Sequence, residues 1–479
     1  MSDRLNFSVE LGKRPHQKSI RGSEKSSLSV VILGAFSGGT GTGNPLSELT
    51  PSLHKVDIDT FDSVISHLQP TLDITLNDSD QSLKITFNCM EDFHPDQLHA
   101  RLAIFHTLGN DDEVIGSAED TAQDSPFNRE KPDQRESEQQ TLSRLLGKRA
   151  LNVEQRQRDT STISDSKQSK IEEVVRRLAE APSLYDEQKE PETGNPIADS
   201  SQQSTALLRY LLHNGAFQAL EASWRSIDWL LRSTEPDEAI HFYLLNAPRQ
   251  VLEEGLLASD NLHTSPIRQL IQQQVMNGAP SEVDFMLIDN HTYTTSKTDL
   301  MMLERLGSLV NSFNGQMYTA ADTCFYGDEE SDNLDLEAWH AFRETAIACR
   351  ISLLLPQILL RLPYGADTDP IESFPFEELD DSWRTKELLW GNPAYAQLIL
   401  LAQQWLSDNP ADDSIITDLP AYTYQQDGEQ YLQPCTEQIL EERPIRRLLD
   451  LGLTPVIGSR KTNSIQLPWF QTLCLDSNI

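Results

Sequence analysis

The 479-residue sequence has few of the features that mark a secreted, membrane-spanning or nucleic-acid-binding protein. Basic residues are scarce, 39 Lys and Arg against 74 Asp and Glu, and the resulting net charge of −35 repels nucleic-acid phosphates and anionic membrane surfaces. No apolar run approaches the ~18 residues that suggest a membrane-spanning helix. The first residues contain no apolar run typical of a secretory signal. We therefore expect a cytoplasmic protein that binds neither nucleic acid nor membrane.

Cysteine is also rare, and the five cysteines are far apart and form no CxxC pair: Cys89, Cys324, Cys349, Cys435 and Cys474. This spacing favours reduced thiols over a disulfide framework. At roughly 150 residues per domain, the length suggests two to four domains. The apolar content of 38% indicates folded domains that are separated by polar linkers.

No catalytic or metal-binding motif stands out. Gly38 and Gly43 have the spacing of a phosphate-binding loop, but Asn44 occupies the position of the lysine that would reach the phosphates. Three neighbouring histidines do not have the i,i+4 spacing of a helical zinc site: His94, His99 and His106. We expect no catalysis, cofactor or metal, and a nucleotide-binding enzyme that uses the Gly38–Gly43 loop is a remote alternative.

The first 108 residues have the pattern of a small α/β domain. Apolar and polar residues alternate at its start, which predicts a half-buried strand with the apolar face Leu5, Phe7, Val9 and Leu11. The apolar run 28–34 predicts a fully buried strand, and strands at 72–76 and 83–87 flank a polar turn and predict a hairpin.

Two helices complete this domain. Asp59 is the expected cap of a helix over residues 60–67. A second helix begins near His94 and carries an apolar face formed by Leu98, Leu102, Phe105 and Leu108.

Residues 109–203 are rich in polar and acidic residues and predict a disordered acidic linker. Two short amphipathic helices are expected within it, at 142–150 and 171–178, the first with the apolar residues Leu142, Leu145 and Leu146. A second, larger α/β domain follows at 204–479, with a strand at 283–288 and a helix at 300–311. Residues 338–362 suggest a long helical region that Pro356 interrupts.

Turns and aromatic residues recur in the larger domain. Phe217, Leu220 and Trp224 fall on one face of a helix, which periodicity alone attributes to the core. Adjacent carboxylates at 377–378 and 380–381 are typical of a solvated loop.

The larger domain resembles the large subunit, TssC, of the contractile sheath of bacterial type VI secretion systems. The matching blocks occur in the family's order at 212–225, 359–365, 389–396, 434–437 and 451–455. They contain the family-motif residues Phe217, Leu220, Trp224, Arg361, Pro363, Tyr364, Gly365, Trp390, Gly391 and Asn392.

The smaller domain resembles the small sheath subunit, TssB, in the blocks 31–38, 45–46, 56–62 and 92–96. Ala35 stands where the family usually carries an acidic residue. The larger domain ends earlier than the large subunit does, so we expect it to be C-terminally truncated. The resemblance implies two sheath-subunit-like α/β domains joined by the linker, in a structural, non-catalytic protein of the sheath.

The resemblance also implies partners: other sheath subunits or copies of itself, the inner tube, the baseplate and a ClpV-type AAA+ ATPase. The main alternative is a sheath-associated accessory protein that caps, limits or nucleates the sheath. The early end of the larger domain suggests this role, because a subunit that can pair on one side only ends a filament.

Three surfaces are predicted to make protein–protein contacts. The apolar face of Leu5 to Leu11 would add to the sheet of a neighbouring molecule. The face of Leu98, Leu102 and Phe105 would dock the small domain on the large one. The face of Leu142, Leu145 and Leu146 would be recognised by the ATPase or pack on the large domain.

Overall fold

A computed structural model describes residues 27–38, 51–75, 82–108, 196–234, 239–257, 262–277, 283–326, 334–380, 382–406, 414–426 and 428–475. The chain divides into two compact units, one of Met1–Leu102 together with Leu207–Ile479 and one of Ala103–Ala206. The strand expected at 5–11, the two amphipathic helices expected at 142–150 and 171–178, and most of the expected linker lie outside the described residues.

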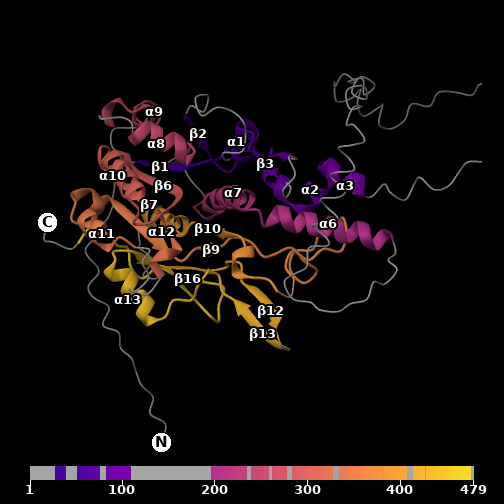
Figure 1. Cartoon of the computed structure of the whole chain (residues 1–479). Helices are drawn as coiled ribbons and strands as arrows, with labels where there is room; N and C mark the ends of the chain where they lie inside the picture. Colours follow the sequence, from indigo (N-terminus) through magenta and orange to yellow (C-terminus); the bar gives the residue numbers. More distant parts are fainter. Residues whose placement is uncertain are drawn as a thin grey trace, which may run out of the picture. The chain divides into compact units, whose positions relative to one another are not determined.

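A seven-stranded sheet forms the centre of the first unit, and its strands β1, β2, β6 and β7 are labelled in Figure 1. The strand order is β14-β8-β7-β6-β1-β5-β2. Neighbouring strands are parallel except for β2, which is antiparallel to β5. The strands are β1 (Ser27–Gly34), β2 (Ser52–Val56), β5 (Ile240–Asn246), β6 (Val283–Tyr293), β7 (Gln316–Ala321), β8 (Ile351–Leu355) and β14 (Thr454–Pro455). A mostly parallel sheet agrees with the α/β class expected from the sequence.

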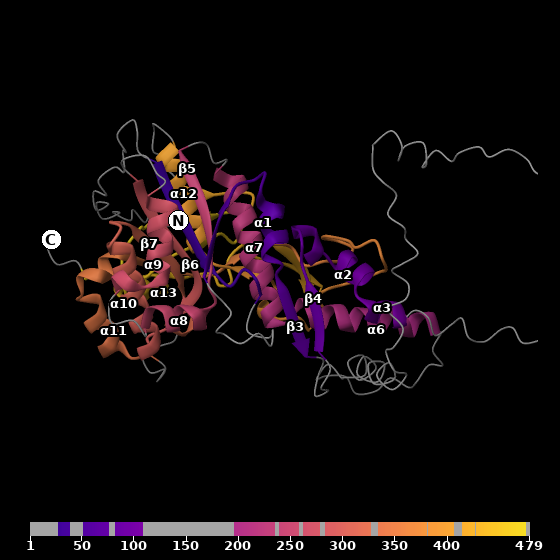
Figure 2. The same ribbon diagram turned by 90° about the horizontal axis from the view of Figure 1, so that it is seen from above.

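Strand β1 comes from the N-terminal part of the chain but pairs on both sides with strands of the C-terminal part. Val31 is opposite Tyr243 of β5 and Leu287 of β6, and in Figure 2 the indigo strand runs among strands of later colours. All eight residues of β1 are buried, as a central parallel strand requires. The expected pair of separate domains is therefore a single unit here, because β1 fills the space between β5 and β6.

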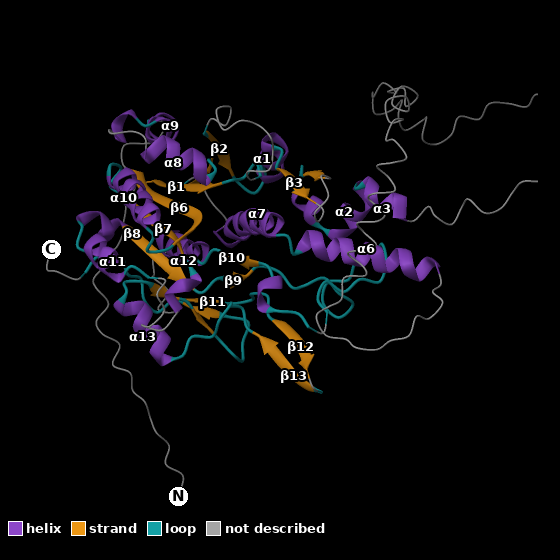
Figure 3. Cartoon of the chain, viewed as in Figure 1, coloured by secondary structure: helices purple, strands orange, loops and turns teal. Residues whose placement is uncertain are grey.

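Helices cover both faces of the sheet (Figure 3). On one face α10 contacts β6, β7 and α8, and on the other α12 contacts β7 and α7. The helices of this unit are α1 (Phe61–Leu68), α2 (Pro95–Arg101), α7 (Gly215–Thr234), α8 (Arg249–Leu257), α9 (Pro266–Ile271), α10 (Lys297–Asn311), α11 (Leu336–Arg343), α12 (Ala394–Leu406) and α13 (Glu442–Asp450). Helix α3 (Ala103–Leu108) belongs to the second unit, and α6 (Pro196–Leu212) begins there.

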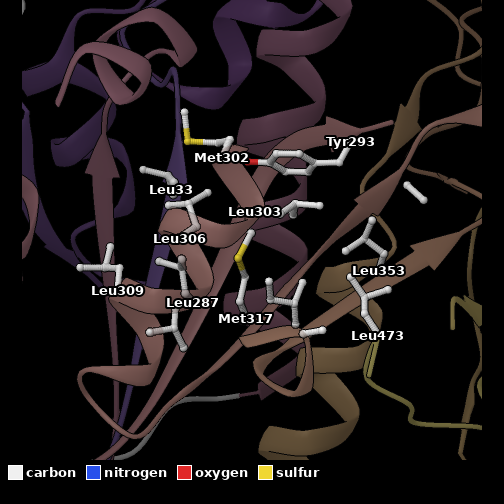
Figure 4. Close-up of a cluster of buried hydrophobic side chains, with 14 of the residues drawn as sticks. Leu33, Leu287, Tyr293, Met302, Leu303, Leu306, Leu309, Met317, Leu353 and Leu473 are labelled. Atoms are coloured by element: carbon white, nitrogen blue, oxygen red, sulfur yellow. The ribbon is translucent and has the colours of Figure 1, made fainter. Parts of the chain in front are cut away.

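A large cluster of buried apolar side chains lies on the face of the sheet that α8 and α10 cover (Figure 4). Leu33 of β1 and Leu287 of β6 pack there with Met302 and Leu306 of α10, and each is at most 1% exposed. Burial of one such side chain contributes about 1.5–3 kcal/mol. Because Val31 and Leu33 of β1 belong to this cluster, the N-terminal segment shares a core with the C-terminal part of the chain.

Several elements of the structure confirm the predictions made from the sequence pattern. The expected hairpin is present as β3 (Thr71–Thr75) and β4 (Ser82–Thr86), which pair antiparallel. Helix α10 includes the expected range 300–311 and begins earlier, because the Ser296 side chain caps it by accepting a hydrogen bond from the Asp299 N–H.

Other expectations are wrong. The long helix at 338–362 does not form: α11 ends at Arg343, and the apolar run Ile351–Leu355 is strand β8, buried on both faces. A short, fully buried apolar run has no periodicity that separates strand from helix. Helix α1 begins at Phe61, and Asp57 rather than Asp59 accepts the Thr60 N–H at 2.8 Å. Extended backbone at Leu102 ends α2, so the helix expected to continue to Leu108 is divided.

Candidate functional site: the junction around helix α7

Helix α7 carries the first of the family-motif blocks and has side chains of both halves of the chain around it. The Asn214 side chain caps it by accepting hydrogen bonds from the N–H groups of Ala216 and Phe217, at 3.0 and 3.3 Å. Its buried positions include Phe217, Leu220 and Trp224, as the helical periodicity predicts. Phe217 and Trp224 contact the N-terminal segment, whereas Glu221 contacts Arg361 of the C-terminal part.

Four phenylalanines of the N-terminal segment surround the aromatic residues of α7. Trp224 lies 5.6 Å from Phe36 and 5.8 Å from Phe61, measured between ring centroids. Phe217 makes edge contacts at 5.9 Å with both Phe87 and Phe93, which stack on each other at 4.1 Å. Such pairs stabilise a core by about 0.5–1.5 kcal/mol each beyond burial. The N-terminal segment is thus held by ring packing as well as by β1.

A network of buried charges lies beside α7. Glu221 is 0% exposed and accepts from Arg361 Nε at 2.8 Å and from Arg225 Nε at 2.7 Å. Arg361 also binds both carboxylate oxygens of Glu378, at 2.7 and 3.0 Å. Arg225 reaches the Tyr364 hydroxyl at 3.0 Å. Two carboxylates therefore face two guanidinium groups, which is the balance that buried ions require.

The ionisation of the network follows from this pairing. Burial acts to raise the pKa of Glu221, but Arg361 and Arg225 outweigh burial and hold that pKa below its ordinary value. Burial acts to lower the pKa of Arg361, and Glu221 and Glu378 raise it well above the ordinary value. Burial raises the pKa of Tyr364 to about 12. Glu221 and Arg361 are therefore charged at neutral pH, and Tyr364 is a neutral hydroxyl.

The charge of Glu221 makes stability depend on pH. Because its pKa is lower in the folded than in the unfolded chain, the stabilisation is complete above the ordinary value of 4.5 and is lost as the pH falls through the folded-state pKa. We expect the free energy of unfolding, measured in urea, to fall as the pH is lowered below 4.5, the ordinary pKa of a glutamate carboxyl. Glu221→Gln should be less stable at pH 7 and lose less on acidification. An equally steep loss in that variant would contradict this assignment.

Glu378 and its neighbours fix the 363–378 loop against the N-terminal half. The Tyr364 N–H donates to Glu378 at 2.8 Å, and the Tyr364 ring lies 5.0 Å from the His94 ring. Asp96 at the start of α2 accepts the N–H groups of Glu372 and Ser373 at 3.0 and 2.9 Å. Glu378 is only 1% exposed, so the expectation of a solvated acidic loop is wrong at this carboxylate.

The motif residues Gly365, Trp390, Gly391 and Asn392 have structural roles. A Cβ at Gly365 would meet a Glu377 carboxylate oxygen at 2.2 Å, and one at Gly391 would meet Leu360 at 2.6 Å. Trp390 Nε1 donates to the Thr385 carbonyl at 2.7 Å. Asn392 Nδ2 donates to the Asp289 carbonyl of β6 at 2.8 Å, which fixes the start of α12 to the sheet. Pro363, in the same loop as Gly365, is buried.

A cavity of about 510 Å³ opens beside the ion network and is lined by Arg209, Tyr210, His213, Asn214, Gly215, Glu378, Asp380 and Glu387. His213 Nε2 lies 3.8 Å from Glu378, and burial lowers the pKa of His213. The described residues contain no group of three or more His, Cys, Asp or Glu that could hold a metal ion. No helix among them is long and apolar enough to cross a membrane.

Gly38, the first glycine of the loop considered for phosphate binding, is required by the local backbone structure. It follows β1 with φ +91°, and a Cβ there would lie 2.1 Å from the Thr71 carbonyl oxygen. The Ser37 carbonyl accepts the Thr71 N–H at 3.0 Å, which joins the end of β1 to β3. The rest of the loop, from residue 39 to Gly43, lies outside the described residues.

We expect Gly38→Ala to lower the free energy of unfolding by at least about 1–3 kcal/mol, because both the positive φ and the contact with Thr71 exclude a side chain. Gly215→Ala is the matched control, since nothing lies within 4 Å of its Cβ position. The control should be neutral or slightly stabilising in urea unfolding. Equal effects of the two substitutions would contradict the explanation.

The structure describes only some of the residues that were predicted to make protein–protein contacts. Leu98, Leu102 and Phe105 are buried, at 2%, 9% and 3% exposure, and their role in docking remains a prediction. The remaining predicted residues lie outside the described part of the chain: Leu5, Phe7, Val9, Leu11, Leu142, Leu145 and Leu146. Sequence reasoning missed Glu221, Glu378 and Asp96. Only Glu221 had a signal, a carboxylate between Leu220 and Trp224 on an apolar helix face.

Two family models match the chain. The model described as EvpB/VC_A0108, tail sheath N-terminal domain, matches residues 195–472. The model described as type VI secretion system, VipA, VC_A0107 or Hcp2, matches residues 9–110. A curated relative, the type VI secretion system sheath protein TssC1 of Pseudomonas aeruginosa, is 27% identical over 320 residues, which cover 61% of this chain. The match spans 64% of the relative's length.

Proposed function

Since the chain belongs to the EvpB/VC_A0108 tail sheath family and also matches the VipA model, we propose that it is a structural, non-catalytic component of a type VI secretion contractile sheath. In this proposal one chain combines a TssB-like and a TssC-like part. The observation that carries it is the position of β1. This strand belongs to the segment that matches the VipA model, and it lies between β5 and β6 of the segment that matches the EvpB/VC_A0108 model.

The fusion fixes the ratio of the two parts at one to one. Phe36, Phe61, Phe87 and Phe93 of the first part pack around α7 of the second, so neither part buries its apolar surface alone. A sheath subunit must transmit displacement without losing its own fold, and a shared sheet provides a rigid body for that purpose. The alternative role, an accessory protein that caps, limits or nucleates the sheath, has no support beyond the early end of the larger domain.

Assembly would use other sheath subunits or copies of this chain as partners. Strand β2 is at the edge of the sheet and has no described strand on its outer side. An edge strand of this kind accepts main-chain hydrogen bonds from an added strand. We place the segment Leu5–Leu11 of a neighbouring copy in that role, with residues 12–27 as a tether that spans up to ~3.3–3.6 Å per residue.

The inner tube, the baseplate and a ClpV-type ATPase are the further partners in this proposal, with the cytoplasm as the compartment. The face of Leu142, Leu145 and Leu146 is the proposed contact for the ATPase. A pull-down of residues 135–180 with the ATPase N-domain should retain this segment, and the same segment with Leu145→Asp and Leu146→Asp should not be retained.

Deletion of residues 1–12 is the test of assembly. We expect the variant to keep near-normal circular dichroism and a cooperative unfolding transition, but to form no sheath-like tubes by electron microscopy and to lose recruitment to sheaths in cells. Labelled full-length copies should be distributed along whole sheaths. Labelling confined to one end would favour the accessory role, and secretion unaffected by deletion of the gene would contradict the proposal.

A further inference from the structure

Two histidines lie next to each other where the edge of the main sheet meets helix α1. His54 is the middle residue of β2, the last strand in the order of the sheet, and His67 is in the last turn of α1, which contacts β2 (Figure 1). Their ring centroids are 5.2 Å apart, and the ring planes are inclined at 59°. Two imidazole rings from different elements are thus close together at the surface of the protein.

The two rings differ in their exposure to solvent. His67 is exposed and His54 is half-buried. Burial lowers the pKa of His54, and the positive charge of a protonated His67 lowers it further, so His54 is mostly a neutral imidazole at pH 7. The neutral ring keeps a nitrogen lone pair and is the form that binds metal ions.

Ser52 provides a hydrogen-bond partner for the His54 ring. Its Oγ lies 3.0 Å from His54 Nε2, and the two residues are two positions apart on the same strand. When the Ser52 hydroxyl accepts the Nε2–H of His54, the proton is held on Nε2 and Nδ1 keeps its lone pair. Histidines that bind metals ordinarily donate their other ring N–H in this way, which fixes the tautomer and the orientation of the ring.

The separation of the rings equals that of two imidazoles bound to one tetrahedral ion. Zinc lies ~2.0–2.1 Å from a coordinating imidazole nitrogen, and the ring centre is about 1.2 Å behind that nitrogen, so each centroid is about 3.2 Å from the ion. Two such centroids at the tetrahedral angle of about 109° are about 5.2 Å apart. The observed separation is 5.2 Å, so α1 and β2 need not move apart or together to hold an ion.

We propose that His54 and His67 bind a divalent transition-metal ion, with Zn²⁺ as the best match, and that water fills the two remaining tetrahedral positions. Imidazole nitrogen is a preferred ligand of zinc, and the net charge of −35 attracts cations to the chain. With two protein ligands rather than four, the site binds zinc more weakly than a structural zinc site does. The bound ion fastens the C-terminal end of α1 to the edge strand β2.

The test is calorimetric titration of the full-length protein with Zn²⁺, after treatment with EDTA and dialysis, with thermal unfolding as the second measurement. We expect Zn²⁺ to bind and to raise the midpoint of thermal unfolding as its concentration increases, because the unfolded chain does not hold the two rings together. His54→Ala and His67→Ala should each weaken this binding at least about 10-fold, since even the loss of a hydrogen-bond partner of a metal ligand costs about 10–100-fold.

His340→Ala is the matched control, because His340 is an exposed histidine of α11, and its replacement should leave the affinity unchanged. Co²⁺ in place of Zn²⁺ identifies the ligands: we expect the visible bands of a tetrahedral nitrogen and oxygen site without the near-ultraviolet band of a thiolate ligand. No Zn²⁺ binding by the wild-type protein, or equal affinity in the wild type and His67→Ala, would overturn the proposal. Because His67 is exposed, its replacement leaves the fold intact even if His54→Ala unfolds.

Discussion

Replacement of Arg361 by alanine is expected to lower the free energy of unfolding by about 3–5 kcal/mol. Arg361 is the shared partner of Glu221 and Glu378, which are 0% and 1% exposed, and its removal leaves two carboxylates next to each other with little solvent. Arg225 would still pair with Glu221 but does not contact Glu378 in the network described above. Urea unfolding followed by tryptophan fluorescence measures the loss.

Arg232→Ala is the matched control for this experiment. Arg232 also pairs with a carboxylate, Asp228, four residues earlier in the same helix, but its side chain is 70% exposed. An exposed pair contributes roughly 0–1 kcal/mol because water and salt screen it. Similar losses in the two variants would show that the network near Glu221 does not behave as a buried one. Double replacement of Arg361 and Glu221 should be less damaging than the sum of the two single effects.

The segment 195–479 expressed alone is expected to be insoluble or to lack a cooperative unfolding transition. Without β1, strands β5 and β6 lose the partner that pairs with both of them, and their facing backbone groups have no hydrogen bonds. The rings of Phe217 and Trp224 also lose their contacts with the N-terminal phenylalanines. Co-expression with residues 1–110 should restore a soluble complex, which size-exclusion chromatography detects.

Variants of the co-expressed N-terminal segment make this experiment specific. Val31→Asp places an unpaired charge in the centre of the sheet, where Val31 is 0% exposed, and should abolish rescue. Asp59→Ala changes an exposed residue of the same segment and should leave rescue intact. A large segment that folds alone, with the same transition as the full chain, would contradict the view that β1 completes its core.

The ion network shows where a local reading of the sequence fails. The pattern of Phe217, Leu220 and Trp224 identifies a buried helix face because residues three and four apart share a face. Glu221 and Arg361 are 140 positions apart, and their pairing depends on where the 359–365 block lies relative to α7. No local rule contains that information, so Glu378 was attributed to a solvated loop although it is buried.

The sequence alone determined the α/β class, the hairpin at β3 and β4, helix α10 and the apolar run of β1, because each depends on a local period or a continuous apolar segment. It also determined the order of family blocks in the two parts of the chain. Only the tertiary structure decided that β1 stands between β5 and β6, that Ile351–Leu355 is a strand, and that Arg361 pairs with both Glu221 and Glu378. The physical reason is that strand pairing and side-chain contact between distant segments depend on which surfaces become buried together, and local periodicity does not encode the partner.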